Sequence, residues 1–172
     1  LDLNKLGITQ VPEEIFDKTT SKFIFSLSLS NNLLHHLPRN VRELQEVTSV
    51  NLSANRLKEL PPELGDLKKL KILNLEKNKL KLLPNEFGNL RSLETLILAY
   101  NELECLPITL APFHALNSLD FAHNQLVALP DSIGMLTNLT ELMLSYNLIS
   151  SIPDSIKKCV MLETFLAQSN KI

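Results

Sequence analysis

Apolar and polar positions recur along this chain with a fixed period of 23 residues. An asparagine returns at that interval, at Asn32, Asn55, Asn78, Asn101, Asn124, Asn147 and Asn170. A proline returns at the same spacing, at Pro38, Pro61, Pro84, Pro107, Pro130 and Pro153. A period of roughly 20 to 50 residues is typical of solenoids, in which each repeat is one unit stacked on the next. The pattern therefore predicts a repeat architecture.

Each repeat follows the apolar frame LxxLxLxxNxLxxLP. Val50 and Leu52 alternate with polar neighbours, which predicts a short strand with one buried face. Leu64, Leu67 and Leu70 follow at a spacing of three, which favours short 3₁₀ or α turns over a long helix. One strand and one return segment per repeat predict an α/β repeat fold. We expect a curved solenoid with a parallel sheet on its concave face and short turns on its convex face.

The repeating asparagines are predicted to be structural residues. After each strand the chain must turn away from the sheet, which buries backbone groups that then have no water to bind. An asparagine amide supplies both a donor and an acceptor for such groups. We therefore expect the seven side chains from Asn32 to Asn170 to form a ladder along the solenoid.

The first and last repeats depart from this apolar frame. The first repeat has Leu6 where asparagine belongs, and a three-residue insertion near residues 17–21 lengthens the step that follows. The last repeat stops at Ile172, before its return segment. Terminal repeats are commonly atypical, and an uncapped repeat exposes an open strand edge. We expect residues 1–172 to form a single domain of about eight repeats, a fragment without its C-terminal cap.

These features resemble those of leucine-rich repeat proteins, and the resemblance covers essentially the whole chain. Residues 61–67, 84–90 and 130–136 read PPELGDL, PNEFGNL and PDSIGML, which is similar to the LPxxIGxLxxL subclass of intracellular Ras-group, or Shoc-type, repeats. That resemblance implies intracellular protein binding, often in small-GTPase signalling. Hosts of this subclass include Ras-suppressor and Shoc-type scaffolds, LAP-type polarity scaffolds, Roco GTPase-kinases and some ubiquitin ligases. The fold alone does not choose among them.

Composition narrows the function classes further. The net charge is −2, and no apolar run approaches the roughly 18 residues that span a bilayer. Two cysteines cannot build a multi-disulfide framework, which favours a reducing compartment. An extracellular receptor ectodomain would carry cysteine-rich caps and a signal peptide, and the sequence shows neither. We expect a cytoplasmic monomer that neither binds nucleic acid nor inserts into membranes.

The sequence contains no motif for catalysis or cofactor binding. It has no glycine-rich phosphate loop, no GxSxG elbow and no Cys/His dyad on adjacent concave positions. No two of its four histidines share the i, i+4 spacing of a helical zinc pair. We expect a chain that is not an enzyme and needs neither metal nor cofactor.

The concave positions differ between the two halves of the solenoid. Repeats two and three present mainly serine and asparagine, whereas repeats five to eight carry a set of large or charged side chains. We call this set the concave patch: Ile97, Tyr100, Asp120, His123, Glu141, Met143, Tyr146 and Leu166. Strands about 4.8 Å apart place its outermost members within roughly 14 Å. Such a composition is typical of a protein-binding hot spot. The alternative is that Met143 and Leu166 pack against a cap or another domain.

Repeats three and four are locally basic, with Arg56, Lys58, Lys68, Lys69, Lys71, Lys77, Lys79 and Lys81. This basic cluster either steers an acidic partner or only solvates one face. We predict a non-catalytic interaction module or scaffold that binds a folded protein on its concave face. The resemblance implies a small GTPase or a phosphatase as the partner. The alternative is that the chain is the recognition segment of a larger enzyme, such as a Roco-type GTPase-kinase or a ubiquitin ligase.

Overall fold

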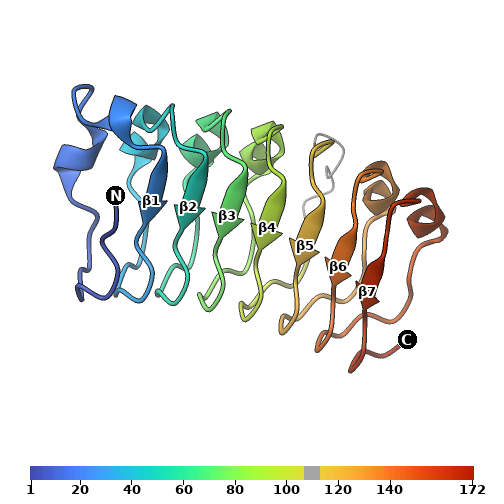
Figure 1. Cartoon of the computed structure of the whole chain (residues 1–172). Helices are drawn as coiled ribbons and strands as arrows, with labels where there is room; N and C mark the ends of the chain where they lie inside the picture. Colours follow the sequence, from blue (N-terminus) through green and yellow to red (C-terminus); the bar gives the residue numbers. More distant parts are fainter. Residues whose placement is uncertain (107–112) are drawn as a thin grey trace.

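The computed structural model describes residues 1–106 and 113–172, so the predicted repeat position Pro107 lies outside the described residues. Within them, seven strands of three residues each form one parallel sheet in chain order. Figure 1 shows these strands side by side in an open, curved row. Their bounds are β1 (Ser26–Ser28), β2 (Ser49–Asn51), β3 (Ile72–Asn74), β4 (Thr95–Ile97), β5 (Ser118–Asp120), β6 (Glu141–Met143) and β7 (Thr164–Leu166).

The register of the sheet repeats without a shift from one strand to the next. Leu27 of β1 pairs with Val50 of β2, and each later strand pairs through the residue 23 positions further on. The central residue of each strand from β1 to β6 is buried, whereas its two neighbours are not. The predicted alternation and the predicted parallel sheet are therefore confirmed. Equivalent residues of successive repeats lie side by side in columns on the concave face.

The return segments form 3₁₀ helices on the other side of the coil (Figure 1). Proline immediately precedes six of them, with φ between −58° and −75°, close to the value at which its ring fixes the backbone. The helices are η1 (Glu13–Phe16), η2 (Ser21–Phe23), η3 (Arg39–Glu43), η4 (Pro62–Asp66), η5 (Asn85–Asn89), η6 (Asp131–Met135) and η7 (Asp154–Lys158). The prediction of short turns on the convex face is confirmed, and every helix in the described ranges is of the 3₁₀ type.

The first repeat differs from the rest, as its sequence indicates. It contributes one isolated parallel bridge between Asp2 and Ser28 in place of a full strand. The predicted insertion forms an extra turn, in which the Thr20 and Ser21 amides both donate to the Asp17 carbonyl at 2.8 Å. Helix η2 follows directly. The insertion is thus accommodated before β1 begins and leaves the register of the sheet unchanged.

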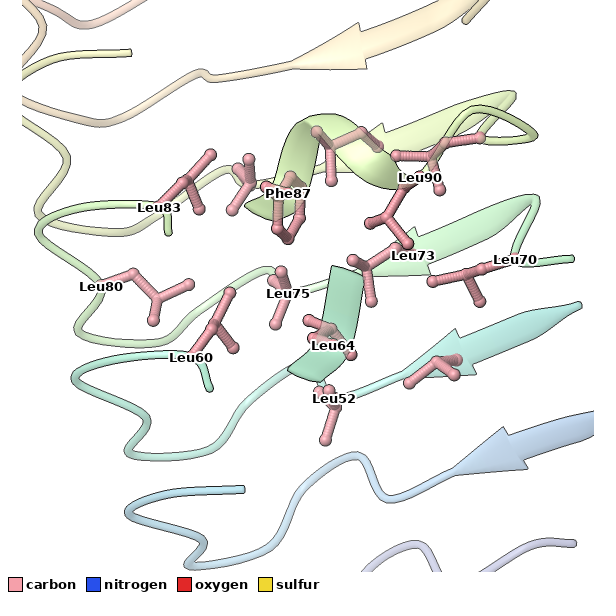
Figure 2. Packing of buried hydrophobic residues seen from close by; sticks show 14 of the residues in the cluster. Leu52, Leu60, Leu64, Leu70, Leu73, Leu75, Leu80, Leu83, Phe87 and Leu90 are labelled. Atoms are coloured by element: carbon pink, nitrogen blue, oxygen red, sulfur yellow. The ribbon is translucent and has the colours of Figure 1, made fainter. Parts of the chain in front are cut away.

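The core is one continuous column of leucines between the strands and the return segments. Figure 2 shows Leu73 of β3 in the same apolar interior as Leu64 and Phe87 of the return segments, and all three are fully buried. Burying one such side chain contributes about 2 kcal/mol. Gly65 allows η4 and η5 to approach closely, because a Cβ at this position would lie 2.2 Å from the Glu86 carbonyl oxygen.

The repeating asparagines join each repeat to the preceding one. The Asn78 Oδ1 accepts the Leu57 amide at 3.0 Å, and its Nδ2 donates to the carbonyls of Leu52 and Leu75, also at 3.0 Å. Equivalent bonds are made by Asn32, Asn55, Asn101, Asn124, Asn147 and Asn170. The amide ladder therefore satisfies backbone groups that the turns bury.

Candidate functional site

Four residues of the concave patch form one row across the sheet. Ile97, Asp120, Met143 and Leu166 are the last residues of β4 to β7, and each is the register partner of the next. The first three are half-buried, and Leu166 is 41% exposed. The unshifted register therefore brings together side chains that lie 23 residues apart in the chain.

Three further patch residues form a stack of rings beside this row. The Tyr100 and His123 ring centroids are 4.1 Å apart with planes inclined by 10°, and those of His123 and Tyr146 are 4.2 Å apart at 12°. His123 is half-buried between the tyrosines, which are 46% and 51% exposed. Stacked rings of this kind contribute about 0.5–1.5 kcal/mol per pair beyond their buried area. The result is a rigid aromatic ladder at the end of the strands.

The backbone conformation at these positions aligns the rings. Tyr100, His123 and Tyr146 have φ of 57°, 55° and 58°, in the left-handed region that disfavours most side chains. The equivalent residue of every other repeat adopts the same conformation, including Lys5 and Ala54. The fold therefore imposes the backbone geometry, whereas the ring side chains are a property of this part of the sequence.

Lys77 occupies the same column one repeat before Tyr100 and extends the aromatic ladder. Its Nζ lies 5.4 Å from the Tyr100 ring centroid and 2.9 Å from a carboxylate oxygen of Glu76. The hydrogen bond and the charge of Glu76 raise the pKa of the Lys77 ammonium. At the opposite end, the residue that follows Tyr146 in the column is the short Ser169. One end of the ladder thus already contacts a cation, and the other end has no large neighbour in its column.

Asp120 lies in the row beside the aromatic ladder. Its Oδ1 accepts the backbone amide of Ala122 at 2.8 Å. Burial raises the pKa of the Asp120 carboxyl, and the charge of Glu76 acts in the same direction. The Ala122 amide and His123 oppose that rise. Asp120 is therefore a partly desolvated carboxylate at the centre of the concave patch.

Glu141 is the second carboxylate of the concave patch. Its Oε2 accepts the Ser118 hydroxyl at 2.9 Å, across the pair of strands β5 and β6. Within the described ranges, no lysine or arginine forms an ion pair with Glu141 or Asp120. The site therefore combines aromatic and aliphatic surface with two carboxylates that form no ion pair with a basic side chain of the described residues.

Some sequence expectations about the concave surface need correction. The alternation of each strand, continued for two residues, predicts that Ala99 and Ser145 also face solvent, but their exposed fractions are only 4% and 5%. Their short side chains do not project far enough from the sheet to reach solvent. The stacking of Tyr100 and Tyr146 on His123 was not foreseen from the sequence. The available signal was the recurrence of rings in one column of the repeat.

Three of the eight side chains in the basic cluster of repeats three and four form ion pairs with carboxylates. Lys69 pairs with Glu46 at 2.6 Å, and Lys71 pairs with Glu94 at 2.8 Å. Lys77 pairs with Glu76, as described above. These three ammonium groups are therefore compensated by neighbouring carboxylates, which weakens the field that the cluster can project.

Other kinds of site find no support among the described residues. In residues 1–106 and 113–172, no three His, Cys, Asp or Glu side chains are grouped so as to hold a metal ion. Of the helices in these ranges, none has the length and apolar character needed to cross a membrane.

Comparison with known proteins identifies the repeat. Residues 63–167 match the family model described as leucine-rich repeat region. The plant peptide hormone receptor RGFR1, in complex with RGF2, has a TM-score of 0.86 and 32% identity, over 99% of this chain and 28% of that chain. A leucine-rich repeat protein of Leptospira interrogans shares the fold, with a TM-score of 0.61 and 24% identity, over 99% of this chain and 60% of that chain.

This chain thus spans less than two thirds of the length of either matched structure. No curated protein sequence matches it. The matched family model covers residues 63–167, more than half of the chain, and the seven-stranded parallel sheet has the architecture of both structures. The chain belongs to the leucine-rich repeat family.

Proposed function

We propose that this chain is a non-catalytic protein-interaction module whose concave patch binds the partner. One observation carries the proposal: exposed tyrosine rings and aliphatic side chains lie in adjacent columns on one side of an aligned sheet. Tyrosine is enriched among hot-spot residues of protein interfaces, and a central apolar area ringed by polar groups is their usual form. We further propose that residues 1–172 act as one domain of about eight repeats.

Preorganisation supports this use of the concave patch. The aromatic ladder holds Tyr100 and Tyr146 against His123, so these side chains have little freedom left to lose when a partner binds. The strands beneath them are joined by the amide ladder and by an unshifted register. The plant receptor with the same solenoid is in complex with RGF2, which supports a ligand-binding role for this architecture.

We propose a small GTPase or a phosphatase as the partner class, in cytoplasmic signalling. The support is the similarity of residues 61–67, 84–90 and 130–136 to the return segments of Ras-group, or Shoc-type, repeats. This finer proposal has a direct test, because a small GTPase can be loaded with GDP or with a GTP analogue before binding is measured. Capture of the same GTPase in one nucleotide state would support it, whereas a prey list without GTPases or phosphatases would contradict it.

The site itself is tested by affinity capture from cell lysate followed by mass spectrometry. The variant carries Tyr100→Ala, Met143→Ala and Tyr146→Ala, and circular dichroism checks that it folds. A matched control carries Glu86→Ala, Arg91→Ala and Met135→Ala, all exposed and on the convex side. We expect specific prey to be retained by the control and lost at least about tenfold by the concave variant, because hot-spot truncations cost upwards of about 1.4 kcal/mol. Equal capture by both variants would refute the proposed site.

A further inference from the structure

We propose that the concave patch binds a basic protein segment, with an arginine or lysine side chain pairing with Asp120 and Glu141. Residues next to that cation would pack on the aromatic ladder and on Met143. This inference rests on the proposed function and adds the charge of the partner. It is carried by the two carboxylates that have no basic partner within the described ranges.

The negative charge of Asp120 is not required by the fold. The first repeat makes the same backbone bond with a carboxylate, since Asp2 accepts the Asn4 amide at 3.0 Å. In two other repeats a neutral amide makes it, since Asn51 accepts the Ser53 amide at 3.0 Å and Asn74 accepts the Glu76 amide at 2.9 Å. Asp120 makes the equivalent bond at 2.8 Å, but burial acts against its ionised form. The turn does not need the negative charge of Asp120, and burial disfavours it. A basic partner that pairs with Asp120 would explain why a carboxylate stands at this position.

Glu141 is equally unusual in its column. The equivalent positions hold short hydroxyl side chains or isoleucine, at Ser26, Ser49, Ile72, Thr95, Ser118 and Thr164. The Ser118 hydroxyl occupies one carboxylate oxygen of Glu141, as the Ala122 amide occupies one oxygen of Asp120. The second oxygen of each carboxylate makes no hydrogen bond to the described residues. Each carboxylate thus keeps an acceptor for a partner.

The two carboxylates lie close enough to act on one partner segment. Glu141 is the register partner of Ser118, which lies two residues before Asp120 on the same face of β5. Strand geometry places the two Cα atoms about 8 Å apart, so one arginine, or two neighbouring basic residues, can reach both. Since arginine presents several donors in a planar fork, it suits a pair of carboxylates beside aromatic rings.

The charges around the concave patch indicate the sign of the charge on the partner. From β4 to β7 the concave columns contain no lysine or arginine, and Asp120 and Glu141 give them a formal charge of −2. By contrast, the lysines nearest to the concave patch are already paired, Lys77 with Glu76 and Lys71 with Glu94. The contact of the Lys77 ammonium with the Tyr100 ring shows that the aromatic ladder accepts a cation. A basic segment is therefore favoured over an acidic one.

The test uses the whole chain as bait for a displayed library of random peptides. We expect the recovered peptides to be enriched in arginine and lysine over the input library. For synthetic copies of the strongest binders, Asp120→Asn and Glu141→Gln should each weaken binding about tenfold, the effect of losing one partly buried charged hydrogen bond. Binding should also weaken as salt is raised. These variants keep the oxygen that accepts from Ala122 or Ser118.

The matched controls are Glu86→Gln and Asp131→Asn, which remove the same charge from exposed positions on the convex side. They should leave binding within about twofold. The inference is overturned if the recovered peptides are neutral or acidic yet still need Tyr146 and Met143, an outcome that leaves the proposed function intact. It is also overturned if basic peptides bind the Asp120→Asn and Glu141→Gln variants as well as the unaltered chain. If no recovered peptide depends on the concave patch, this inference fails, while the proposed function is still decided by the affinity capture with the concave and convex variants.

Discussion

Tyr100 and Asn101 are neighbours in the chain, yet the repeat requires only the asparagine. The Asn101 amide bonds to the backbone of its own repeat and of the preceding one. The position of Tyr100 holds Lys5, Ala54 or Ser169 in other repeats, always with φ near 55°. The frame residues therefore maintain the solenoid, while the residues between them are free to vary and set the chemistry of the concave surface.

Asp120 offers a residue-scale prediction about pH. Burial raises its carboxyl pKa above the ordinary value of 3.8, so the folded chain holds this proton more tightly than the unfolded chain. Protonation of Asp120 therefore stabilises the folded chain relative to the unfolded chain. This stabilisation is complete below pH 3.8 and is lost as the pH rises through the pKa of Asp120 in the folded chain. We expect Asp120→Asn to be more stable than the unaltered chain at pH 7, with a smaller difference at pH 3. Urea unfolding measures this, and a difference independent of pH would contradict it.

Sequence reasoning could place the patch residues in columns but could not predict their contacts. The frame assigns Tyr100, His123 and Tyr146 to one column because they are 23 residues apart. Their stacking depends on a left-handed backbone at each position, which tyrosine rarely adopts. The hydrogen bond of Asp120 and the burial of Ser145 likewise depend on how the chain turns after each strand. Such features follow from tertiary geometry and not from periodicity.

The strand, the turn and the return segment form one element that is repeated along the molecule. Its spacing is readable in the sequence, and the predicted short strands and convex 3₁₀ turns are confirmed. The hydrogen bonds that link one repeat to the next are harder to predict from the sequence. The asparagine of each repeat reaches back to a carbonyl and an amide of the preceding repeat, as Asn78 does with Leu52 and Leu57. Stability is therefore shared between neighbouring repeats.

The contribution of the amide ladder to stability can be tested at Asn101, which links two neighbouring repeats. In Asn101→Ala the buried Leu80 amide loses its acceptor, whereas the carbonyls of Leu75 and Leu98 each keep a second donor from a neighbouring ladder asparagine. We expect the free energy of unfolding to fall by about 1–3 kcal/mol, the cost of one buried group left unpaired. The control Asn89→Ala removes an exposed amide from η5 and should cost less than about 0.5 kcal/mol. Equal losses in urea unfolding would show that the ladder does not carry this stability.

At the scale of the molecule, a continuous leucine core holds seven strands in one register. That alignment makes residues 23 apart neighbours and so builds one concave surface from many short segments. The period alone was enough to predict the solenoid and its parallel sheet. The period does not identify a partner, because the concave side chains can vary while the frame residues stay the same. The distribution of rings, aliphatic groups and carboxylates over β4 to β7 is the information specific to this chain.

Hydroxyl-radical footprinting of the chain, alone and with its captured protein or selected peptide, tests the central claim most directly. Tyr100, Met143 and Tyr146 are readily oxidised side chains on the concave patch, and Met135 in η6 is an exposed internal reference on the other side. We expect oxidation of the three patch residues to slow several-fold on binding while that of Met135 is unchanged, because a bound partner excludes water from hot-spot residues. Protection of Met135, with Tyr100 and Tyr146 oxidised as fast as in the free chain, would contradict the account.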